Sequence, residues 1–480
     1  MSVKFELVSE AELSKMREAT MQILNNIGIA TTSDKFRSFL LDNGCKEKNG
    51  NGRIVFPQPV IDKALKTVPK EWTITGRGGK HVVEMGKNKA NAQVCIGMPS
   101  MMDLDTGERR DATLNDLEDF TRLADALDHI NIAAPIFPKD VPQESLVTLE
   151  TATLLRNSTK PFRLCLESHD EWPYVHEVLL AVAGSEKELQ EKGLGYYEVS
   201  PLSPLDYGKG PADAMMDVVE AGLPLGMDPA PLMGATSPIT IAGTVAQHMA
   251  ELLVGVITSQ LMNPGHSVIV SPRSGGLMEM KSGVALWAIP EMGLGGGLNV
   301  QFAKSFGLPA GCGCYTGASK VADAQSGYEH LYNALIPALL GIDVCGSAGS
   351  VDNALIGSYE MLVIDNELSS IIQWTIEGIN INDDTLALNV IEKVVNGDGN
   401  FLGEKHTRKH LRSGQEIWKP VICERAPYET WEAKGQKRLE DVAKERAKEL
   451  LSIHEVEPLS PEVDAELDKI IASAQKTLAE

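Results

Sequence analysis

The chain has 480 residues, of which 43% are hydrophobic, and its formal net charge is −22. That size is sufficient for a large core, and because there is no run of 18 apolar residues we expect no transmembrane helix. With this charge and no dense basic patch, nucleic acid and anionic membranes are poor candidate partners. An acidic surface is ordinary for a soluble enzyme, and it would also attract a cationic substrate or a basic partner surface. The acidic N-terminus lacks an apolar signal core, which favours a cytoplasmic location.

Residues 1–91 are predicted to form an N-terminal cap of mixed structure. Helical spacing runs over Glu10–Ile27, a shorter helix is expected over Pro57–Val68, and Thr73–Val83 is typical of a hairpin. None of these stretches carries a recognisable chemical motif.

Eight strand–helix repeats are predicted within residues 92–380. The expected strands are Val94–Gly97, Ile130–Ile136, Phe162–Leu166, Gly195–Val199, Leu223–Met227, Ser267–Val270, Ala310–Tyr315 and Ile342–Cys345. The expected helices are Leu114–Leu127, Glu144–Arg156, Glu171–Val182, Pro211–Ala221, Ile239–Leu261, Gly283–Phe306, Ala322–Leu340 and a stretch after Ser350. Eight such units favour an α/β fold of the closed (β/α)8 TIM-barrel type, and an open doubly wound sheet with one misassigned strand is the alternative.

The fifth unit, within Met227–Gln260, shows the expected pattern most clearly. An apolar run ends at Asp228, a loop rich in Gly, Ala and Thr follows, and Ser237 is predicted to cap a helix whose first residue is Pro238. Loops after the strands of such a fold carry the chemistry. Here they consist mainly of Gly, Ser, Pro and Thr, which suits a binding cavity better than acid–base catalysis.

Residues 381–480 are predicted to form a helical extension. Phe401–Arg412 is basic, and Arg438–Leu451 has the pattern of a strongly charged amphipathic helix. We expect these helices to pack against the barrel or against a second subunit, so a homo-oligomer is possible.

Familiar cofactor motifs do not occur. Gly293–Gly297 lacks the G-x-G-x-x-G spacing, and no G-x-x-x-x-G-K-[ST], H-E-x-x-H or G-x-S-x-G sequence is found. We therefore expect no tightly bound cofactor and no metal. The seven cysteines include no C-x-x-C pair and are interpreted as reduced core residues, with zinc or redox use of Cys312 and Cys314 as the less favoured alternative. A Schiff base on Lys320 is also less favoured than a solvated side chain.

Several stretches resemble, in order, the trimethylamine methyltransferase (MttB-like) superfamily. They are Ser200–Leu205, Gly234–Gly243 with Ala250-Glu251, Asp323–Glu329, and the Trp418–Trp431 tail. The resemblance implies a TIM barrel that moves a methyl group from a methylated amine to Co(I) of a separate corrinoid protein. The cobalamin would thus be supplied by a partner.

Trimethylamine-specific members carry pyrrolysine, whereas this chain has only standard residues, so it resembles the non-pyrrolysine branch that acts on quaternary amines. Glycine betaine, proline betaine, carnitine and γ-butyrobetaine are the implied substrates. Two alternatives remain open, which are a methyltransferase with a different methyl donor and a non-catalytic betaine-binding barrel.

The resemblance assigns substrate-binding roles by residue type, and no catalytic residue is expected because Co(I) is itself a strong nucleophile. Aromatic faces and carboxylates suit a permanent cation, and the candidates are Glu167, Asp228, Tyr315 and Glu329. For a betaine carboxylate the best donor is Arg273, with Thr236 and Gln325 as further donors. The alternative for Gln325 and Glu329 is helix capping and hydrogen bonding that only supports the loop.

Overall fold

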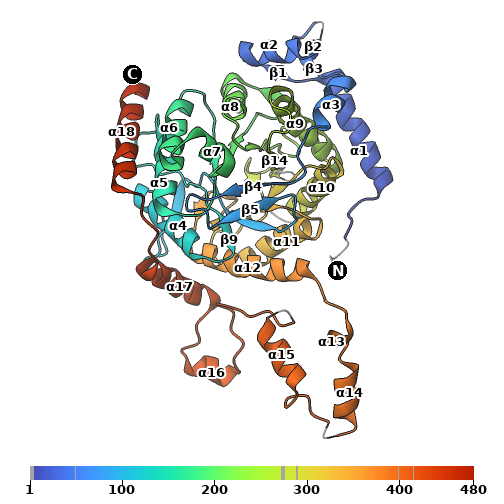
Figure 1. The fold of residues 1–480 in the computed structure, drawn as a ribbon, viewed down its shortest axis with the longest axis vertical. Coiled ribbons are helices and arrows are strands. Elements are labelled where there is room, and N and C mark those ends of the chain that lie inside the picture. The colour runs from blue at the N-terminus through green and yellow to red at the C-terminus, as the bar shows by residue number, and fades with distance from the viewer. Residues whose placement is uncertain are drawn as a thin grey trace.

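The structure is a computed structural model that describes residues 5–48, 50–271, 276–287, 290–397, 399–414 and 416–479. A ring of strands lies inside a layer of helices, a hairpin lies across the ring, and an extension projects from one side (Figure 1).

Eight parallel strands form the ring. They are β6 (Asn91–Val94), β9 (Ile130–Ile132), β10 (Phe162–Cys165), β11 (Gly195–Val199), β13 (Leu225–Met227), β14 (Val268–Val270), β17 (Gly311–Gly313) and β18 (Val344–Ala348). β10, β11, β13 and β14 pair in that order, as do β17, β18, β6 and β9. Single parallel bridges, Ala133 with Phe162 and Val270 with Ala310, join the two sheets at both junctions. Every strand therefore has a neighbour on each side, and the predicted (β/α)8 barrel is confirmed.

Helices follow the ring strands and cover their outer faces. They are α4 (Leu114–Ala126), α5 (Leu146–Asn157), α6 (Trp172–Ala183), α7 (Glu186–Lys192), α8 (Lys209–Glu220), α9 (Ile241–Met262), α10 (Glu291–Ser305), α11 (Ala324–Leu339) and α12 (Tyr359–Glu377). α9 is long and apolar enough to cross a membrane by length and composition. However, 78% of that apolar window is buried, and α1, α3, α8 and α10 pack against it. It is therefore a core helix of the barrel.

Three predicted elements need correction. α9 begins at Ile241 with Thr240 as its N-cap residue, not at Pro238, because Ser237 belongs to a turn in which its carbonyl accepts the Gly234 N–H at 3.0 Å. β6 begins three residues before the predicted strand. The prediction followed apolar runs, and Asn91 and Gln93 in β6 are polar. α10 begins at Glu291, and the residues before it form a short hairpin, β15 (Leu277–Met278) with β16 (Ala285–Leu286).

The hairpin of β4 (Trp72–Thr75) and β5 (Val82–Met85) closes the N-terminal end of the barrel. Ile74, Val83 and Met85 pack in one buried cluster with side chains from ring strands, including Tyr196 and Val344 near the strand starts. Access to the barrel interior is therefore from the opposite end, where the strands finish, as in other barrels of this type.

The remaining N-terminal elements lie beside the barrel. They are α1 (Glu10–Gln22), a π-helix (Ile23–Ile27), β1 (Ala30–Thr31), α2 (Asp34–Asp42), β2 (Lys46–Glu47), β3 (Ile54–Val55) and α3 (Gln58–Leu65). β1 pairs with β12 (Asp206–Tyr207), which follows β11. A further small sheet, formed by β7 (Ser100–Met102), β8 (Arg109–Asp111), β19 (Ser350–Val351) and β20 (Ile356–Gly357), follows β6 and β18.

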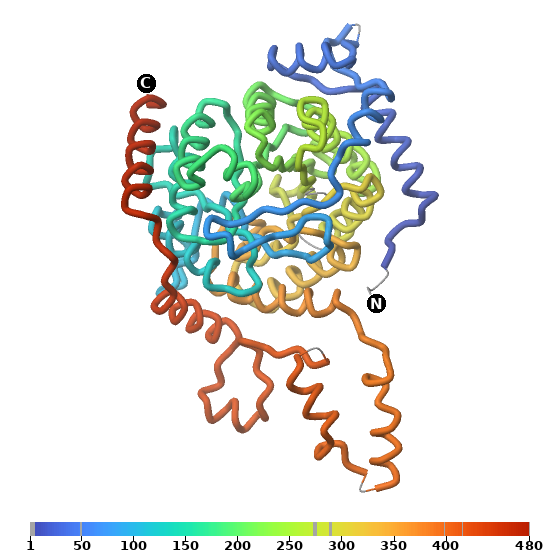
Figure 2. The backbone as a smooth tube through the Cα atoms, in the orientation of Figure 1, coloured from blue at the N-terminus to red at the C-terminus, as the bar shows by residue number. Residues whose placement is uncertain are grey.

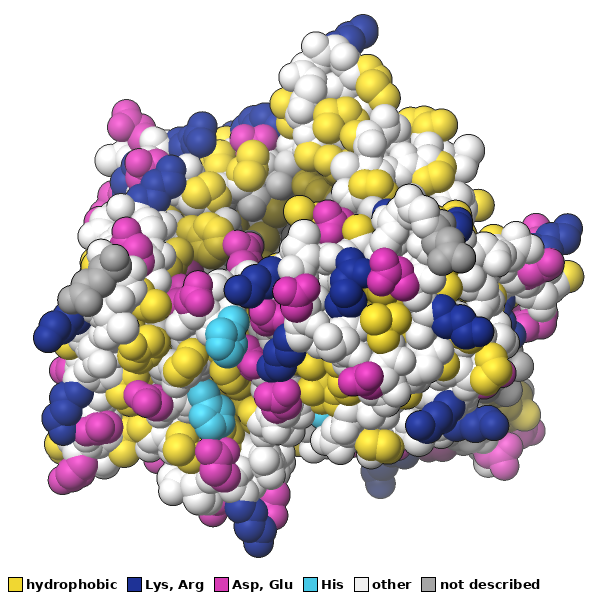
Figure 3. Space-filling view, turned by 90° about the horizontal axis from the view of Figure 1, so that it is seen from above, with side chains coloured by type: hydrophobic (Ala, Val, Ile, Leu, Met, Phe, Trp, Pro, Cys, Tyr) yellow, Lys and Arg dark blue, Asp and Glu magenta, His cyan; other side chains and the backbone are white. Residues whose placement is uncertain are grey.

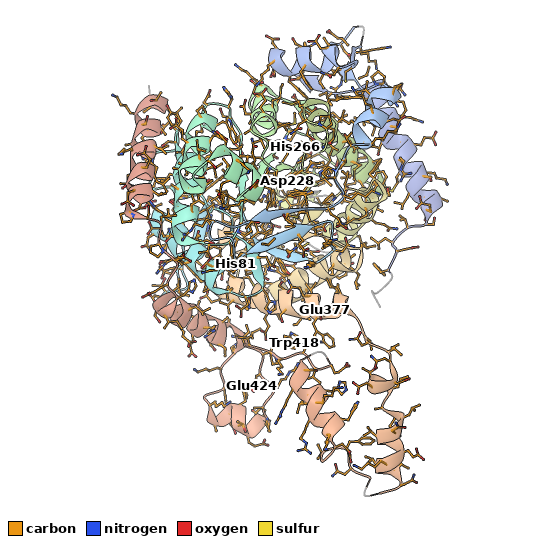
Figure 4. The ribbon with its side chains drawn as sticks, viewed as in Figure 1. His81, Asp228, His266, Glu377, Trp418 and Glu424 are labelled. Atoms are coloured by element: carbon orange, nitrogen blue, oxygen red, sulfur yellow. The ribbon has the colours of Figure 1, made fainter. Side chains whose placement is uncertain are left out.

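The C-terminal extension leaves the barrel after α12 and returns to it (Figure 2). Residues 379–437, which we call the C-terminal arm, contain α13 (Asp383–Leu386), α14 (Leu388–Val395), α15 (Lys405–Ser413) and α16 (Tyr428–Ala433). α17 (Leu439–Ile453) then packs on α12 and α4, and α18 (Pro461–Leu478) packs on α5 and α6. Trp418, labelled in Figure 4, anchors the arm by donating its indole N–H to Ser370 Oγ at 2.8 Å.

One face of the molecule shows acidic and basic side chains interspersed, with apolar side chains gathered around a hollow at one edge (Figure 3). No extended basic area is visible on that face.

Candidate active site

A buried ion cluster occupies the barrel interior. Arg163 on β10 forms ion pairs with Glu198 on β11 and with Asp228, which follows β13 (Figure 4 labels Asp228). All three residues are at most 5% exposed. Burial alone would lower the pKa of Arg163, but the charges of Glu198 and Asp228 outweigh it and raise that pKa. The cluster therefore has one cation and two carboxylates, and the Asp228 carboxylate already faces a guanidinium.

A cavity of about 520 Å³ opens at the ends of β6, β10 and β11. Its lining combines apolar and acidic side chains from loops and from the first turns of α5, and consists of Ile96, Gly97, Phe137, Gln143, Leu146, Val147, Glu150, Cys165, Leu166, Glu167, Ser168, Glu171 and Ser200. We call it the rim cavity. Gly97 has a φ of +77°, a backbone conformation that favours glycine, and it lies beside the Phe137 ring.

Three carboxylates in the rim cavity differ in their surroundings. Glu150 is 2% exposed, and its Oε1 atom has no hydrogen-bond partner within the described part of the chain. Burial, reinforced by the charges of Glu171 and Glu167, raises the pKa of Glu150 well above its ordinary value. Burial also raises the pKa of Glu171, although Thr148 donates its backbone N–H at 2.9 Å and its hydroxyl at 3.0 Å to that carboxylate. Glu167 is exposed to solvent.

This arrangement favours a positively charged ligand. A buried carboxylate without a donor is costly in water-poor surroundings, and nearby like charges increase that cost. A cation with apolar substituents would neutralise the carboxylates while it fills the apolar part of the cavity. Phe137 adds an aromatic face, to which cations are attracted.

The loops after β11 and β13 are joined through Glu251 on α9. Its carboxylate accepts the Ser203 hydroxyl at 2.8 Å, the Leu205 N–H at 2.9 Å and the Gln247 side-chain amide at 3.0 Å. Gln247 also donates to the Thr236 carbonyl at 2.9 Å. Burial raises the pKa of Glu251 to about 7, although these donors oppose the shift. Two of the stretches that resemble the methyltransferases therefore meet at one buried carboxylate.

The loop after β17 is organised by Glu329 on α11. This residue is 3% exposed and accepts the backbone N–H groups of Ala318 at 2.8 Å and Ser319 at 3.2 Å. Gln325 donates to the same carboxylate at 3.1 Å. Tyr315 is fully buried, and its ring lies 6.5 Å from that of His330. None of Tyr315, Gln325 and Glu329 lines the rim cavity.

The predicted substrate residues are therefore not brought together. Glu167 lines the rim cavity, Asp228 lies deeper in the barrel, and Thr236 is half-buried, with its hydroxyl accepting the Leu232 N–H at 2.8 Å. Arg273 lies outside the described residues. The substrate-binding roles of all seven residues stay predictions.

The seven cysteines are free thiols. Cys312 and Cys314, the close pair in the sequence, are both buried, and Cys314 also contacts Cys345. Burial raises the pKa of Cys314, and its hydrogen bonds with the two neighbouring thiols act in the same direction. A raised pKa suits an inert thiol in the core.

A family model described as trimethylamine methyltransferase (MTTB) matches residues 2–479. The chain belongs to the trimethylamine methyltransferase family. It is 30% identical over 480 residues to the glycine betaine methyltransferase of Desulfitobacterium hafniense (strain Y51), covering 99% of this chain and 98% of that protein. It is 28% identical to the trimethylamine methyltransferase MttB of Methanosarcina thermophila, covering 96% of each. Among solved structures, the crystal structure of the Methanosarcina barkeri monomethylamine methyltransferase (MtmB) aligns over 98% of this chain and 92% of its own, at 12% identity and a TM-score of 0.48.

Membership in the trimethylamine methyltransferase family confirms the resemblance found in the sequence and makes this chain a methyltransferase by family. The residues that sequence reasoning missed are Glu150, Glu171, Arg163 and Glu198. Glu150 lies within an apolar stretch of α5, and the available signal was its spacing of three and four residues from Val147 and Leu146, which places it on their face.

Proposed function

We propose that the protein transfers a methyl group from a quaternary amine of the betaine type to Co(I) of a partner corrinoid protein. The observation that carries the proposal is the rim cavity, which the buried Glu150 and the half-buried Glu171 line together with Phe137 and aliphatic side chains. Family membership supplies the methyl transfer, and the similar glycine betaine methyltransferase supports a quaternary amine as donor. Candidate substrates are glycine betaine, proline betaine, carnitine and γ-butyrobetaine.

The chemistry needs no nucleophile from the protein. Co(I) donates an electron pair to the methyl carbon, the carbon–nitrogen bond breaks with its electrons on nitrogen, and a neutral tertiary amine leaves as methyl–Co(III) forms. The role of the chain is to hold the N-methyl group in line with cobalt and to exclude water. In the rim cavity Glu150, Glu171 and Phe137 would hold the ammonium head, and the open end of the barrel would receive the corrinoid domain.

A betaine also carries a carboxylate, which requires a donor at the other end of the molecule. Arg273 is proposed for this role, because it comes three residues after the end of β14 in the sequence and an arginine pairs well with a carboxylate. Replacing it by alanine should reduce kcat/KM for betaines far more than for a quaternary amine without a carboxylate. Equal kcat/KM values for wild type and Arg273→Ala on a betaine would reject this role.

The decisive experiment is spectroscopic. Cobalamin is reduced to Co(I), the purified protein is added, and formation of methyl–Co(III) is followed with each betaine and with trimethylamine. We expect methylation with one or more betaines and none with trimethylamine. Absence of methylation by folded protein with every betaine, also when candidate corrinoid proteins replace free cobalamin, would contradict the proposal and favour another methyl donor or a non-catalytic binding protein.

Two matched variants test whether the rim cavity binds the substrate in this assay. Glu150→Gln keeps the shape of the side chain and removes its charge, and it should reduce kcat/KM for a quaternary amine. Glu144→Gln changes an exposed carboxylate two residues before the same helix and should leave kcat/KM unchanged.

We also propose that the protein works in the cytoplasm. Co(I) persists only under strongly reducing conditions, and seven free thiols suit a reducing compartment.

A further inference from the structure

The C-terminal arm contains a cluster of metal-ligand side chains far from the barrel interior. His406 and His410 lie one turn apart on α15 and face Asp384 of α13 (Figure 1 shows both helices). One donor atom from each of the three side chains lies within 4.8 Å of the other two. Over the described ranges, this is the one group of three or more His, Cys, Asp or Glu side chains with such geometry.

His410 presents a ring nitrogen to the Asp384 carboxylate, and His406 presents one to the backbone carbonyl of the same residue. His410 Nε2 lies 3.3 Å from Asp384 Oδ2, and the two imidazole rings are 4.2 Å apart between centroids. His406 Nε2 lies 2.9 Å from the backbone carbonyl of Asp384. On its other side, His410 Nδ1 lies 4.0 Å from Glu416 Oε1.

We propose that the arm binds one zinc ion through Asp384, His406 and His410, with water as the fourth ligand. Two imidazoles and a carboxylate are ligands that Zn²⁺ prefers, and histidines four residues apart on a helix present both rings on one face.

The helices of the C-terminal arm have little hydrophobic packing to hold them together. α13 and α15 bury no residue, and α14 buries Val394 alone. Apolar side chains stay exposed on the arm instead, including Leu388 at 69%, Val395 at 71% and Leu402 at 80%. Small units without a core are commonly stabilised by metals or disulfides. Zinc would tie α13 to α15 in the part of the chain where hydrophobic packing is weakest.

Lys409 competes for the same carboxylate, and this makes the proposal sharply testable. Its ammonium nitrogen lies 2.6 Å from Asp384 Oδ2, so it competes with zinc for this oxygen. A site built for zinc should therefore bind the ion more tightly when Lys409 is removed. A cluster that is only a salt-bridge network should instead lose order in the same variant and gain no affinity for the metal.

The test uses the full-length protein, stripped of metal with a chelator and titrated with Zn²⁺ by calorimetry, and with Co²⁺ by its visible absorption. We expect one ion per chain in the wild type, at least about tenfold weaker binding in His410→Gln, and several-fold tighter binding in Lys409→Ala. Lys405→Ala, which removes an exposed cation from the same helix, should bind as the wild type does.

Hydrogen exchange gives a second readout that does not depend on affinity. Zinc should slow amide exchange across α13 and α15 in the wild type, and should leave it unchanged in His410→Gln. The proposal is overturned if neither the wild type nor Lys409→Ala binds zinc at one equivalent, or if His410→Gln binds it as tightly as the wild type.

Discussion

Two acidic groups lie where the barrel strands end, and they differ in what surrounds their carboxylates. In the rim cavity, Glu150 is buried with an oxygen that accepts no hydrogen bond from the described residues, and burial raises its pKa. In the loop after β17, Glu329 is equally buried but accepts two backbone N–H groups and the Gln325 amide. A carboxylate that is given donors by its own chain stabilises a loop. One that is left without donors favours an external cation.

Glu251 differs from both of these residues. Its carboxylate accepts hydrogen bonds from the chain, and burial nevertheless raises its pKa. Its pKa is raised from 4.5 to about 7, so the folded state binds its proton more tightly than the unfolded state. The resulting stability is fully present below pH 4.5 and is lost as the pH rises to about 7, by at most about 3 kcal/mol. Glu251→Gln should flatten the unfolding free energy over this range in urea titrations, and an unchanged pH profile would contradict the role of this residue.

Glu329→Ala should show the largest purely structural effect in the loop after β17. The variant leaves the N–H groups of Ala318 and Ser319 without their acceptor, which should lower the free energy of unfolding by about 2–3 kcal/mol. Thermal and urea unfolding measure the change. An unaltered stability together with a large loss of substrate affinity would instead assign Glu329 to the substrate.

Glu150→Gln should show the opposite behaviour. Because the variant removes a buried ionisable group without removing a hydrogen bond to its Oε1 atom, we expect stability to be equal or higher. The kcat/KM for a quaternary amine should fall about 30-fold, which corresponds to roughly 2 kcal/mol of lost attraction to the cation. Unfolding of the variant below the wild-type temperature would show that Glu150 is structural.

Lys320→Ala should have the smallest effect. Its ammonium lies 2.6 Å from Asp352, and the Lys320 side chain is 62% exposed, so the change in unfolding free energy should stay below about 0.5 kcal/mol. Methyl-transfer rates should also be unchanged. A rate lowered by more than tenfold would restore the Schiff-base hypothesis for this lysine.

Most of the barrel could be predicted because its strands are short apolar runs at regular spacing, as in Gly195–Val199 and Phe162–Cys165. The predicted boundaries of helices and strands were wrong where polar or glycine-rich stretches occupy positions that are usually apolar. Asn91 and Gln93 are polar and nevertheless buried in β6, and the hairpin before α10 has no strong apolar pattern. α2 and α7 were missed because each is short and contributes only one or two buried side chains.

The site was harder to predict. A sequence pattern can place a residue on a helix or a strand, but it does not show how many hydrogen-bond donors reach the side chain. Glu329 lies near the start of the seventh barrel helix as expected, yet the loop after β17 folds its own N–H groups onto that carboxylate. Tyr315 comes two residues after β17, where strand alternation no longer fixes its direction, and its ring packs with His330. Glu150 is contributed by a helix and faces the cavity only because α5 starts at the open end of the barrel.

The most direct test of the cation site is calorimetry of ligand binding in buffers with different ionisation enthalpies, near neutral pH. The ligand is tetramethylammonium or a betaine that supports turnover, and wild type is compared with Glu150→Gln. A cation beside Glu150 should lower its raised pKa, so binding should release protons in the wild type. We predict proton release and tighter binding in the wild type, with both reduced in the variant. Equal affinity and equal proton release in the two proteins would contradict the assignment of the rim cavity to the ammonium group.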